Sequence, residues 1–429
     1  MEFLGYPIKK ASNTIKKTQN FTSGELDNWQ KQKKWSIVKH HFFENQFYKN
    51  KVGKKIPQKW EELPIITKLD FQTDLNKLLS NKYNLKNTYV GNTSGSSGNP
   101  FFYAKNKFAH AMTWAISENR YGWHNLTMQS KQARFFGTTR KMPEKYYELM
   151  KDQILNRIRF NVFNLSDEGY NAFIINFKRH EFEYIYGYTN TLILFSEFLI
   201  RNKIVLKDIC PSLRLCIVTS EVLTSKNRLL LIQGFGLKVV NEYGISEAGG
   251  ITAFQNDKMD WKLSRETQYM EIIDEENNLI KGNNSGAILI TDLYNHAMPI
   301  IRYKVGDIGS FKIGSNKGQL DKLIGRTNDN IILPNGETSP GLTFYYISKS
   351  TLERSGVLKE FIIRQTKPDT LVFDIISDRN LTNDEILHLQ SDIKLYLKCK
   401  LKLIINRVYK IKRPESGKIK HFYSELDEK

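Results

Sequence analysis

The stretch TSGSSGNP, at residues 93–100, decides the fold that we expect for this chain. Its glycines allow backbone conformations that other residues avoid, so successive N–H groups can point into one concavity. Its hydroxyl groups add further hydrogen-bond donors, and no side chain in the stretch is bulky. We interpret the stretch as a loop that binds phosphate groups. The residues that would bind are Thr93, Ser94, Gly95, Ser96, Ser97 and Gly98.

Two other interpretations of this stretch are a surface loop and a Walker A motif. Clusters of serine and glycine often form surface loops or linkers, so the composition alone leaves that alternative open. A P-loop ATPase requires Gly-Lys-Ser/Thr at the end of its loop, whereas this stretch ends in Gly-Asn-Pro. The stretch is therefore not a Walker A motif, and other motifs must support a phosphate-binding role.

The composition is that of a globular protein with more than one domain. The chain has 429 residues, of which 40% are hydrophobic, so it can bury a large core. Its longest apolar stretch, residues 191–200, is too short to span a bilayer, and its first residues lack the order of a signal peptide. We therefore expect a cytoplasmic protein. Cys210, Cys216 and Cys399 are scattered, which predicts buried thiols rather than disulfides or a zinc site.

The chain is strongly basic. It has 64 Lys and Arg against 45 Asp and Glu, a net charge of +19, and residues 394–420 contain Glu415 as their single acid. A solvated basic face is one interpretation, and an anionic partner is the other. That partner could be a nucleic acid, an anionic membrane surface in peripheral contact, or a phosphate-rich ligand such as a nucleotide or coenzyme A. No nucleic-acid-binding motif accompanies the charge, so we expect no nucleic acid partner.

The pattern of apolar residues predicts an α/β fold. Residues up to about 60 have apolar side chains at helical spacing, and short β-rich runs alternate with helical stretches between residues 88 and 300. This alternation favours a mostly parallel sheet with flanking helices. From about residue 329, strands at 360–365, 370–376 and 401–409 and a helix at 383–397 predict a small α+β unit. The boundary is expected within LIGRTNDN, residues 323–330.

Four motifs follow the phosphate loop along the chain. In NEYGISEAGG, residues 241–250, a tyrosine ring could lie on a flat ligand and the following glutamate could hold a cation. An aspartate in the Gly-Asp turn of residues 306–307 is suited to binding vicinal hydroxyls. GRTNDNII follows at 325–332, and PESGKIKHF at 414–422 places a lysine directly after a glycine.

In their order and spacing, these motifs resemble the core motifs of the adenylate-forming superfamily of acyl-CoA ligases, adenylation domains and luciferases. The resemblance extends from end to end, and it is greatest to the phenylacetate-CoA ligase branch and its relatives in capsule and surface-polysaccharide biosynthesis. The opening helices, the segment LPIITK and the short chain all match that branch. The resemblance implies a large N-terminal adenylate-forming domain that binds ATP and the acyl group, residues 1–327, and a small mobile C-terminal lid domain, residues 328–429.

The resemblance also implies roles for particular residues. The phosphate loop would bind the β- and γ-phosphates of ATP, Tyr243 would stack on adenine, and Glu247 would coordinate Mg²⁺. Asp307 would accept hydrogen bonds from the ribose, and Lys418 would contact the acyl carboxylate and the α-phosphate as the catalytic residue. The remaining implied ATP-binding residues are Gly244, Ser246 and Arg326, and Asn328 stands at the implied hinge, where the family usually has Asp or Lys.

The acyl pocket is less well defined by the sequence. TSEVL at 219–223 stands where relatives often have a Gly-Ala-Glu type sequence, so Ser220 would narrow the pocket beside Glu221. Tyr186 and Tyr188 are candidates for its lining. The alternative is that both tyrosines are ordinary core residues.

The resemblance implies an ATP- and Mg²⁺-dependent ligase that forms an acyl-adenylate, releases pyrophosphate and transfers the acyl group to coenzyme A. One rival keeps the adenylation but gives the acyl group to an amine, as in amide formation during capsule building. Another is a non-catalytic nucleotide-binding relative, against which Lys418 and Glu247 argue. A nucleic-acid-binding protein is the least favoured. The carboxylic acid itself is not identified by the sequence.

Overall fold

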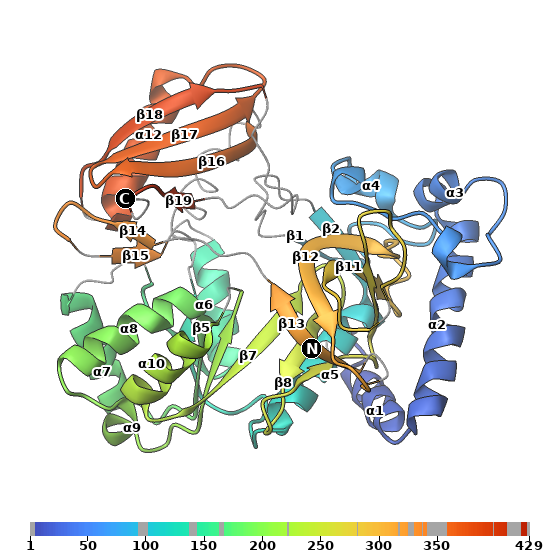
Figure 1. The fold of residues 1–429 in the computed structure, drawn as a ribbon, viewed down its shortest axis with the longest axis horizontal. Helices are drawn as coiled ribbons and strands as arrows, with labels where there is room; N and C mark the ends of the chain where they lie inside the picture. Colours follow the sequence, from blue (N-terminus) through green and yellow to red (C-terminus); the bar gives the residue numbers. More distant parts are fainter. Residues whose placement is uncertain are drawn as a thin grey trace. The chain divides into compact units, whose positions relative to one another are not determined.

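The structure is a computed structural model in which the described residues pack into two compact units (Figure 1). Unit 1 comprises Met1–Gly95, Pro100–Thr127 and Glu242–Gly325, and unit 2 comprises Ser96–Asn99, Met128–Asn241 and Arg326–Lys429. Strand β7 (Lys238–Ile245) begins in unit 2 and ends in unit 1. The described residues are 5–92, 102–136, 144–162, 167–220, 223–280, 282–315, 318–324, 330–336, 338–340, 358–397, 399–409 and 422–426.

Unit 1 opens with helices, as the apolar spacing predicts. The long helix α2 begins with a capping box, in which the Thr22 side chain accepts a hydrogen bond from the Glu25 N–H and the Glu25 carboxylate accepts one from the Thr22 N–H. The helices of this unit are α1 (Ile8–Gln19), α2 (Ser23–Glu44), α3 (Gln46–Val52), α4 (Leu75–Leu78) and α5 (Lys107–Gly122), with short 3₁₀ turns η2 (Trp60–Glu62) and η3 (Leu69–Phe71).

The strands of unit 1 pair in antiparallel fashion. Their order is β10-β11-β12-β13-β9-β8-β7, and β1 and β2 form a separate hairpin. Apolar side chains such as Ile245, Ile272, Ile288 and Ile290 form the core of this unit. The strands are β1 (Thr88–Asn92), β2 (Phe102–Asn106), β8 (Gly250–Gln255), β9 (Trp261–Leu263), β10 (Gln268–Ile273), β11 (Gly286–Asp292), β12 (Tyr303–Phe311) and β13 (Gln319–Ile324).

Unit 2 contains the parallel strands. Strand β3 pairs in parallel with β4 and β5, and β5 pairs in parallel with β6. Phenylalanines from strands and helices form the core between them, and the rings of Phe135 and Phe160 stack at 4.5 Å. The elements are β3 (Gln132–Phe135), α6 (Glu144–Ile154), β4 (Arg157–Arg159), α7 (Asp167–Arg179), β5 (Tyr184–Tyr188), α8 (Thr189–Arg201), α9 (Leu206–Ile209), β6 (Leu215–Thr219) and α10 (Ser225–Phe235).

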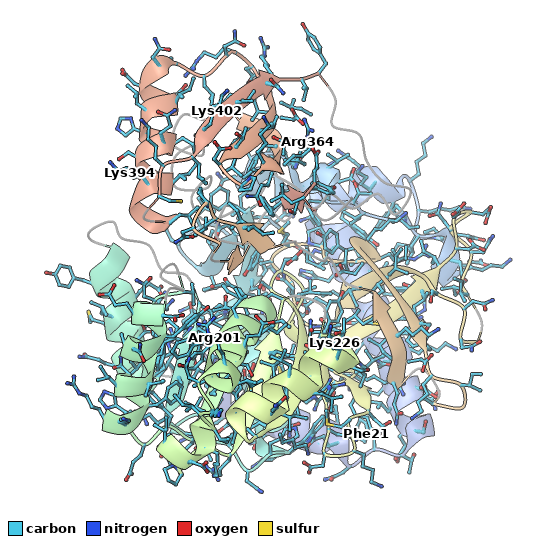
Figure 2. The ribbon with its side chains drawn as sticks, turned by 60° about the vertical axis from the view of Figure 1, so that its left-hand side comes forward. Phe21, Arg201, Lys226, Arg364, Lys394 and Lys402 are labelled. Carbon is cyan, nitrogen blue, oxygen red and sulfur yellow. The ribbon has the colours of Figure 1, made fainter. Side chains whose placement is uncertain are left out.

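The C-terminal part of unit 2 is a small α+β domain. Its four-stranded sheet has the order β18-β17-β16-β19, and helix α12 connects the parallel pair β17 and β18. Figure 2 shows Lys394 on α12 and Lys402 on β18, and both are exposed, so part of the basic C-terminal charge lies on the surface. The elements are β14 (Asn330–Ile332), β15 (Thr338–Pro340), β16 (Leu358–Lys367), β17 (Thr370–Ser377), α12 (Asn383–Leu397), β18 (Lys402–Arg407) and β19 (Phe422–Ser424).

The expected α/β class, with large sheets and a smaller C-terminal sheet domain, is confirmed. The expectation of a mostly parallel sheet holds for β3 to β6, but the strands of unit 1 are antiparallel. The turn at residues 246–249 explains the first reversal, because so short a connection can join only antiparallel strands. The proposed boundary between residues 327 and 328 lies outside the described residues and stays a prediction.

Two further expectations concern the apolar stretch and the cysteines. Residues 191–200 belong to helix α8, and within the described part of the chain no helix combines the length and the apolar character that a membrane span needs. Cys210 and Cys216 are buried and Cys399 is partly buried, and none of the three forms a disulfide.

Candidate functional site

Tyr243 and Asp307 meet at the end of strand β7. The Tyr243 hydroxyl donates a hydrogen bond of 2.7 Å to Oδ2 of Asp307, although 64 residues separate them. A β-bulge between Tyr243 and Gly244 changes the register of β7 there, which is a common device for redirecting side chains near sites. Asp307 follows Gly306, whose φ of 88° favours glycine. The structure thus brings together two residues that the sequence motifs predict separately.

Glu247 lies in the tight turn between β7 and β8 and is only 9% exposed. Its Oε1 accepts a hydrogen bond of 3.1 Å from the Tyr303 hydroxyl. Burial raises the pKa of Glu247 above its ordinary value, while its own backbone N–H, Tyr303 and the ammonium groups of Lys68 and Lys105 act in the opposite direction. A cation bound at this carboxylate would relieve the cost of burying its negative charge.

The sequence analysis missed two charged residues, Lys105, which lies near Glu247, and Asp292, which lies near Lys105. Both are almost fully buried. Burial lowers the pKa of Lys105 to about 8, and the carboxylates of Asp292 and Glu247 oppose that shift. Asp292 Oδ1 accepts backbone hydrogen bonds from Tyr294 and Asn295, whereas its Oδ2 has no hydrogen-bond partner among the described residues. Lys105 follows the apolar run FFYA, and a lysine at the end of such a run is the signal that could have identified it.

The residues fit a magnesium ion that is bound together with a substrate. In the described part of the chain, no group of three or more His, Cys, Asp or Glu side chains could hold a metal ion by itself. Magnesium commonly takes one or two carboxylates from the protein and completes its shell with water and substrate phosphates. Glu247 could supply such a carboxylate, so the donor set suits an ion that arrives with phosphate groups.

The other predicted ATP-binding residues are only partly described. Gly244 and Ser246 are exposed next to Tyr243 and Glu247, on the strand end and the turn. The following predicted residues lie outside the described residues: Thr93, Ser94, Gly95, Ser96, Ser97, Gly98, Glu221, Arg326, Asn328 and Lys418. Their roles stay predictions.

The predicted acyl-pocket residues of unit 2 gather at the carboxyl ends of parallel strands. The ring of Phe136, directly after β3, lies 4.9 Å from that of Tyr186 and 4.4 Å from that of Tyr188, both on β5. Ser220 directly follows β6, and its φ of 73° is unusual for a residue other than glycine. The carboxyl ends of parallel strands are where α/β proteins commonly bind ligands.

Arg134 is a further residue of this group that the sequence analysis missed. Its guanidinium lies 4.3 Å from the centre of the Phe136 ring and 5.4 Å from that of Tyr186. It stands in the apolar run ARFF, and a charge inside such a strand is the signal that could have identified it. Tyr188 is buried and Tyr186 is partly exposed. The alternative that these tyrosines are ordinary core residues therefore fits Tyr188 better than Tyr186.

The chain is similar to solved structures over nearly its whole length. A 2-hydroxyisobutyryl-CoA ligase, solved with 2-HIB-AMP and CoA in the thioesterification state, is 14% identical with a TM-score of 0.61, covering 94% of this chain and 90% of that one. The chain has the adenylate-forming ligase fold. The same ligase in a postadenylation state with R3-HIB-AMP gives 14% identity and a TM-score of 0.58, covering 95% of this chain and 91% of that one.

Sequence comparison adds one relative. Protein CapK of Staphylococcus aureus is 22% identical over 417 residues, which are 92% of this chain and 87% of CapK. No protein-family profile matches the chain. The end-to-end resemblance to the adenylate-forming fold that the motifs indicated is therefore confirmed at the level of structure.

Proposed function

We propose that this protein is an ATP-dependent ligase that activates a carboxylic acid as an acyl-adenylate and passes the acyl group to coenzyme A. The observation that carries the proposal is the meeting of Tyr243 and Asp307, at 2.7 Å, in the unit that also holds the buried Glu247. The adenylate-forming ligase fold supports it. The relative CapK is consistent with a place in capsule or surface-polysaccharide biosynthesis, which stays a prediction.

The proposed chemistry assigns a task to each group. The ring of Tyr243 would face the adenine, and its hydroxyl would hold the Asp307 carboxylate ready for the ribose hydroxyls. Glu247 would hold the Mg²⁺ that offsets the charge of the phosphates. The acyl carboxylate attacks the α-phosphate, the bond to pyrophosphate breaks, and pyrophosphate leaves. Lys418 would relieve the repulsion between the two anions in the transition state.

The test is acid-dependent release of pyrophosphate from ATP and Mg²⁺, screened over aryl, fatty, amino and uronic acids. We expect Lys418→Ala to lose adenylate formation by on the order of a hundredfold to a thousandfold, the usual effect of removing one transition-state contact. The same variant, supplied with a pre-made acyl-adenylate, should still transfer the acyl group at a near-normal rate. A wild-type protein that releases no pyrophosphate with any acid would refute the proposal.

Lys420→Ala is the matched control, because Lys420 carries the same charge two residues further on without a preceding glycine. It should change pyrophosphate release little. If Lys420→Ala abolished the release while Lys418→Ala did not, the assignment of the catalytic lysine would be wrong.

The acceptor needs a separate experiment, because an amine is the alternative to coenzyme A. With the activated acid identified, coenzyme A and a panel of amino sugars and amino acids are each added, and the acylated product is identified by mass spectrometry. We expect the thioester of coenzyme A. Formation of an amide instead would leave the proposed adenylation standing and would show that the acceptor is an amine.

A further inference from the structure

A row of charged and aromatic side chains crosses the parallel sheet of unit 2. In the register of this sheet, Arg134 on β3 lies opposite Arg159 on β4 and opposite Tyr186 on β5. Residues that lie opposite each other on neighbouring strands project from the same face of the sheet. Arg157, two residues before Arg159, projects from that face as well. The face therefore carries three guanidinium groups beside the Tyr186 ring.

Helix α6 supplies the carboxylates that neutralise the arginines of β4. Asp152 forms ion pairs with Arg157 and, at 2.5 Å, with Arg159. Glu148 forms a further ion pair with Arg159. Among the residues that the structure describes, no carboxylate forms an ion pair with Arg134. The charge of Arg134 is therefore not balanced by the described part of unit 2.

The surroundings of Arg134 carry an excess of positive charge. Lys151 shares Glu148 with Arg159, at 2.9 Å from its Oε1, so the ion pairs of α6 and β4 already join three cations to two carboxylates. Burial lowers the pKa of Arg157 from its ordinary value, and the like charge of Arg134 acts in the same direction, whereas the ion pair of Arg157 opposes the shift. An anion bound to Arg134 would offset this repulsion.

The guanidinium of Arg134 lies among aromatic rings at the proposed acyl pocket. It is 4.3 Å from the centre of the Phe136 ring and 5.4 Å from that of Tyr186, and all three side chains are partly exposed. An arginine has five N–H donors. One Nη1 hydrogen is donated to Gln132 Oε1 at 3.1 Å, and the Nε is enclosed. The remaining Nη hydrogens suffice for two parallel bonds to a carboxylate of a ligand.

We propose that the carboxylic acid activated by this protein carries a second carboxylate, which Arg134 binds beside the rings of Phe136 and Tyr186. The inference rests on the proposed ligase activity and names the class of its substrate. The flat guanidinium matches a flat carboxylate, and the rings would pack against the carbon skeleton of the acid. An ammonium group, as in an amino acid, would be repelled, and a neutral fatty acid would leave Arg134 without an anion.

The test compares dicarboxylic acids with their monomethyl esters, which keep the skeleton of the acid and lose one charge. The acids are glutaric, adipic and terephthalic acid, and kcat/KM for pyrophosphate release is measured with each acid and each monoester. We expect the diacid of at least one pair to be favoured about tenfold to a hundredfold, because hydrogen bonds to charged groups are the stronger ones. The difference should lie mainly in KM, since Arg134 would bind a part of the acid that does not react.

Three variants assign the preference to Arg134. Arg134→Gln should bring the ratio of diacid to monoester close to one by raising KM for the diacid. Arg134→Lys should keep part of the preference, because it retains the charge and loses the flat pair of donors. Arg201→Gln is the matched control, because Arg201 is an exposed arginine of the same unit at the end of α8 (Figure 2). It should keep the ratio of the wild type. The melting temperature of each variant shows whether it folds.

The outcomes separate this inference from the ligase activity. A wild-type protein that releases pyrophosphate with other acids, but treats both members of every pair alike or prefers the monoesters, would overturn the inference and leave the ligase activity standing. A folded Arg134→Gln protein with the full preference for the diacid would overturn the role of Arg134. Release of pyrophosphate with no acid at all would overturn the ligase activity, and the inference with it.

Discussion

Burial of the Glu247 carboxylate disfavours its ionised form. Burial raises its pKa above the ordinary value of 4.5. The folded state therefore binds more protons than the unfolded state above that pH, so the contribution of Glu247 to stability decreases as the pH rises. If Glu247 is the proposed metal ligand, its negative charge is available at the cost of some stability.

Glu247→Gln is expected to separate the effect of Glu247 on stability from its proposed role in binding Mg²⁺. The amide oxygen can still accept the hydrogen bond of Tyr303, and the buried charge is removed. The free energy of unfolding, measured with denaturant at pH 8, should equal or exceed that of the wild type, and the difference should shrink toward pH 4.5. Mg²⁺-dependent pyrophosphate release should fall on the order of a hundredfold. An undiminished rate of pyrophosphate release by the variant across a Mg²⁺ titration would show that Glu247 is not a metal ligand.

Lys105 is expected to lower the pKa of Glu247 through its positive charge. Its ammonium lowers the pKa of Glu247, so Lys105→Met should raise that pKa further. If activity requires ionised Glu247, the acidic limb of the pH–rate profile should move to higher pH.

Lys107→Met is the control for Lys105, because Lys107 lies two residues away and is exposed. It should leave the acidic limb in place. A Lys105→Met protein with lower activity but an unmoved limb would show a purely structural role for this lysine.

At the scale of elements, Gly187 shows how closely the parallel strands of unit 2 approach. A Cβ at this position would lie 2.5 Å from Phe135 Cβ and 2.9 Å from the Phe135 carbonyl oxygen, on the neighbouring strand β3. Gly187→Ala would force the backbones of β3 and β5 apart, so we expect it to lower the free energy of unfolding by about 1–3 kcal/mol. Chemical denaturation measures the change.

Gly24 is the opposite case and provides the control. It lies in helix α2, and a Cβ there would meet nothing within 4 Å. Gly24→Ala should therefore stabilise the protein by about 0.5–1 kcal/mol, because it reduces the freedom of the unfolded chain. Equal effects of the two substitutions would contradict the close approach at Gly187.

Local patterns predicted individual elements well and their pairing poorly. Helix α12 has the expected bounds, and β16, β17 and β18 overlap the strands expected at 360–365, 370–376 and 401–409. The antiparallel strands of unit 1 could not be predicted, because pairs such as Gln319 with Lys262 join segments far apart in the sequence. The register of such pairs depends on tertiary packing rather than on local pattern.

The same limit applied to the candidate site. The motifs identified Tyr243 and Asp307 one by one, but their hydrogen bond depends on the sheet that brings them together. Lys105 and Arg134 were missed because a charged residue in a strand normally indicates a solvent-facing position. Only the three-dimensional structure shows that Lys105 is buried near two carboxylates and that Arg134 lies over aromatic rings.

At the scale of the whole molecule, each unit has its own core, and strand β7 belongs to both. Aliphatic strands form the core of unit 1, and phenylalanine rings dominate that of unit 2. The first half of β7, Lys238–Asn241, belongs to unit 2, and the second half, Glu242–Ile245, belongs to unit 1. Because the chain passes from one unit to the other in the middle of a strand, we expect the two cores to be lost in one step.

The division of the chain also separates its chromophores. All six tryptophans belong to unit 1, namely Trp29, Trp35, Trp60, Trp114, Trp123 and Trp261. Tryptophan emission during denaturation therefore reports on unit 1 alone, whereas far-ultraviolet circular dichroism reports on the helices and strands of both units. We expect the two midpoints to coincide. A dichroism transition that continues after the emission has stopped changing would show that unit 2 keeps its structure after unit 1 has unfolded. The optical signals alone would then follow each half of the molecule separately.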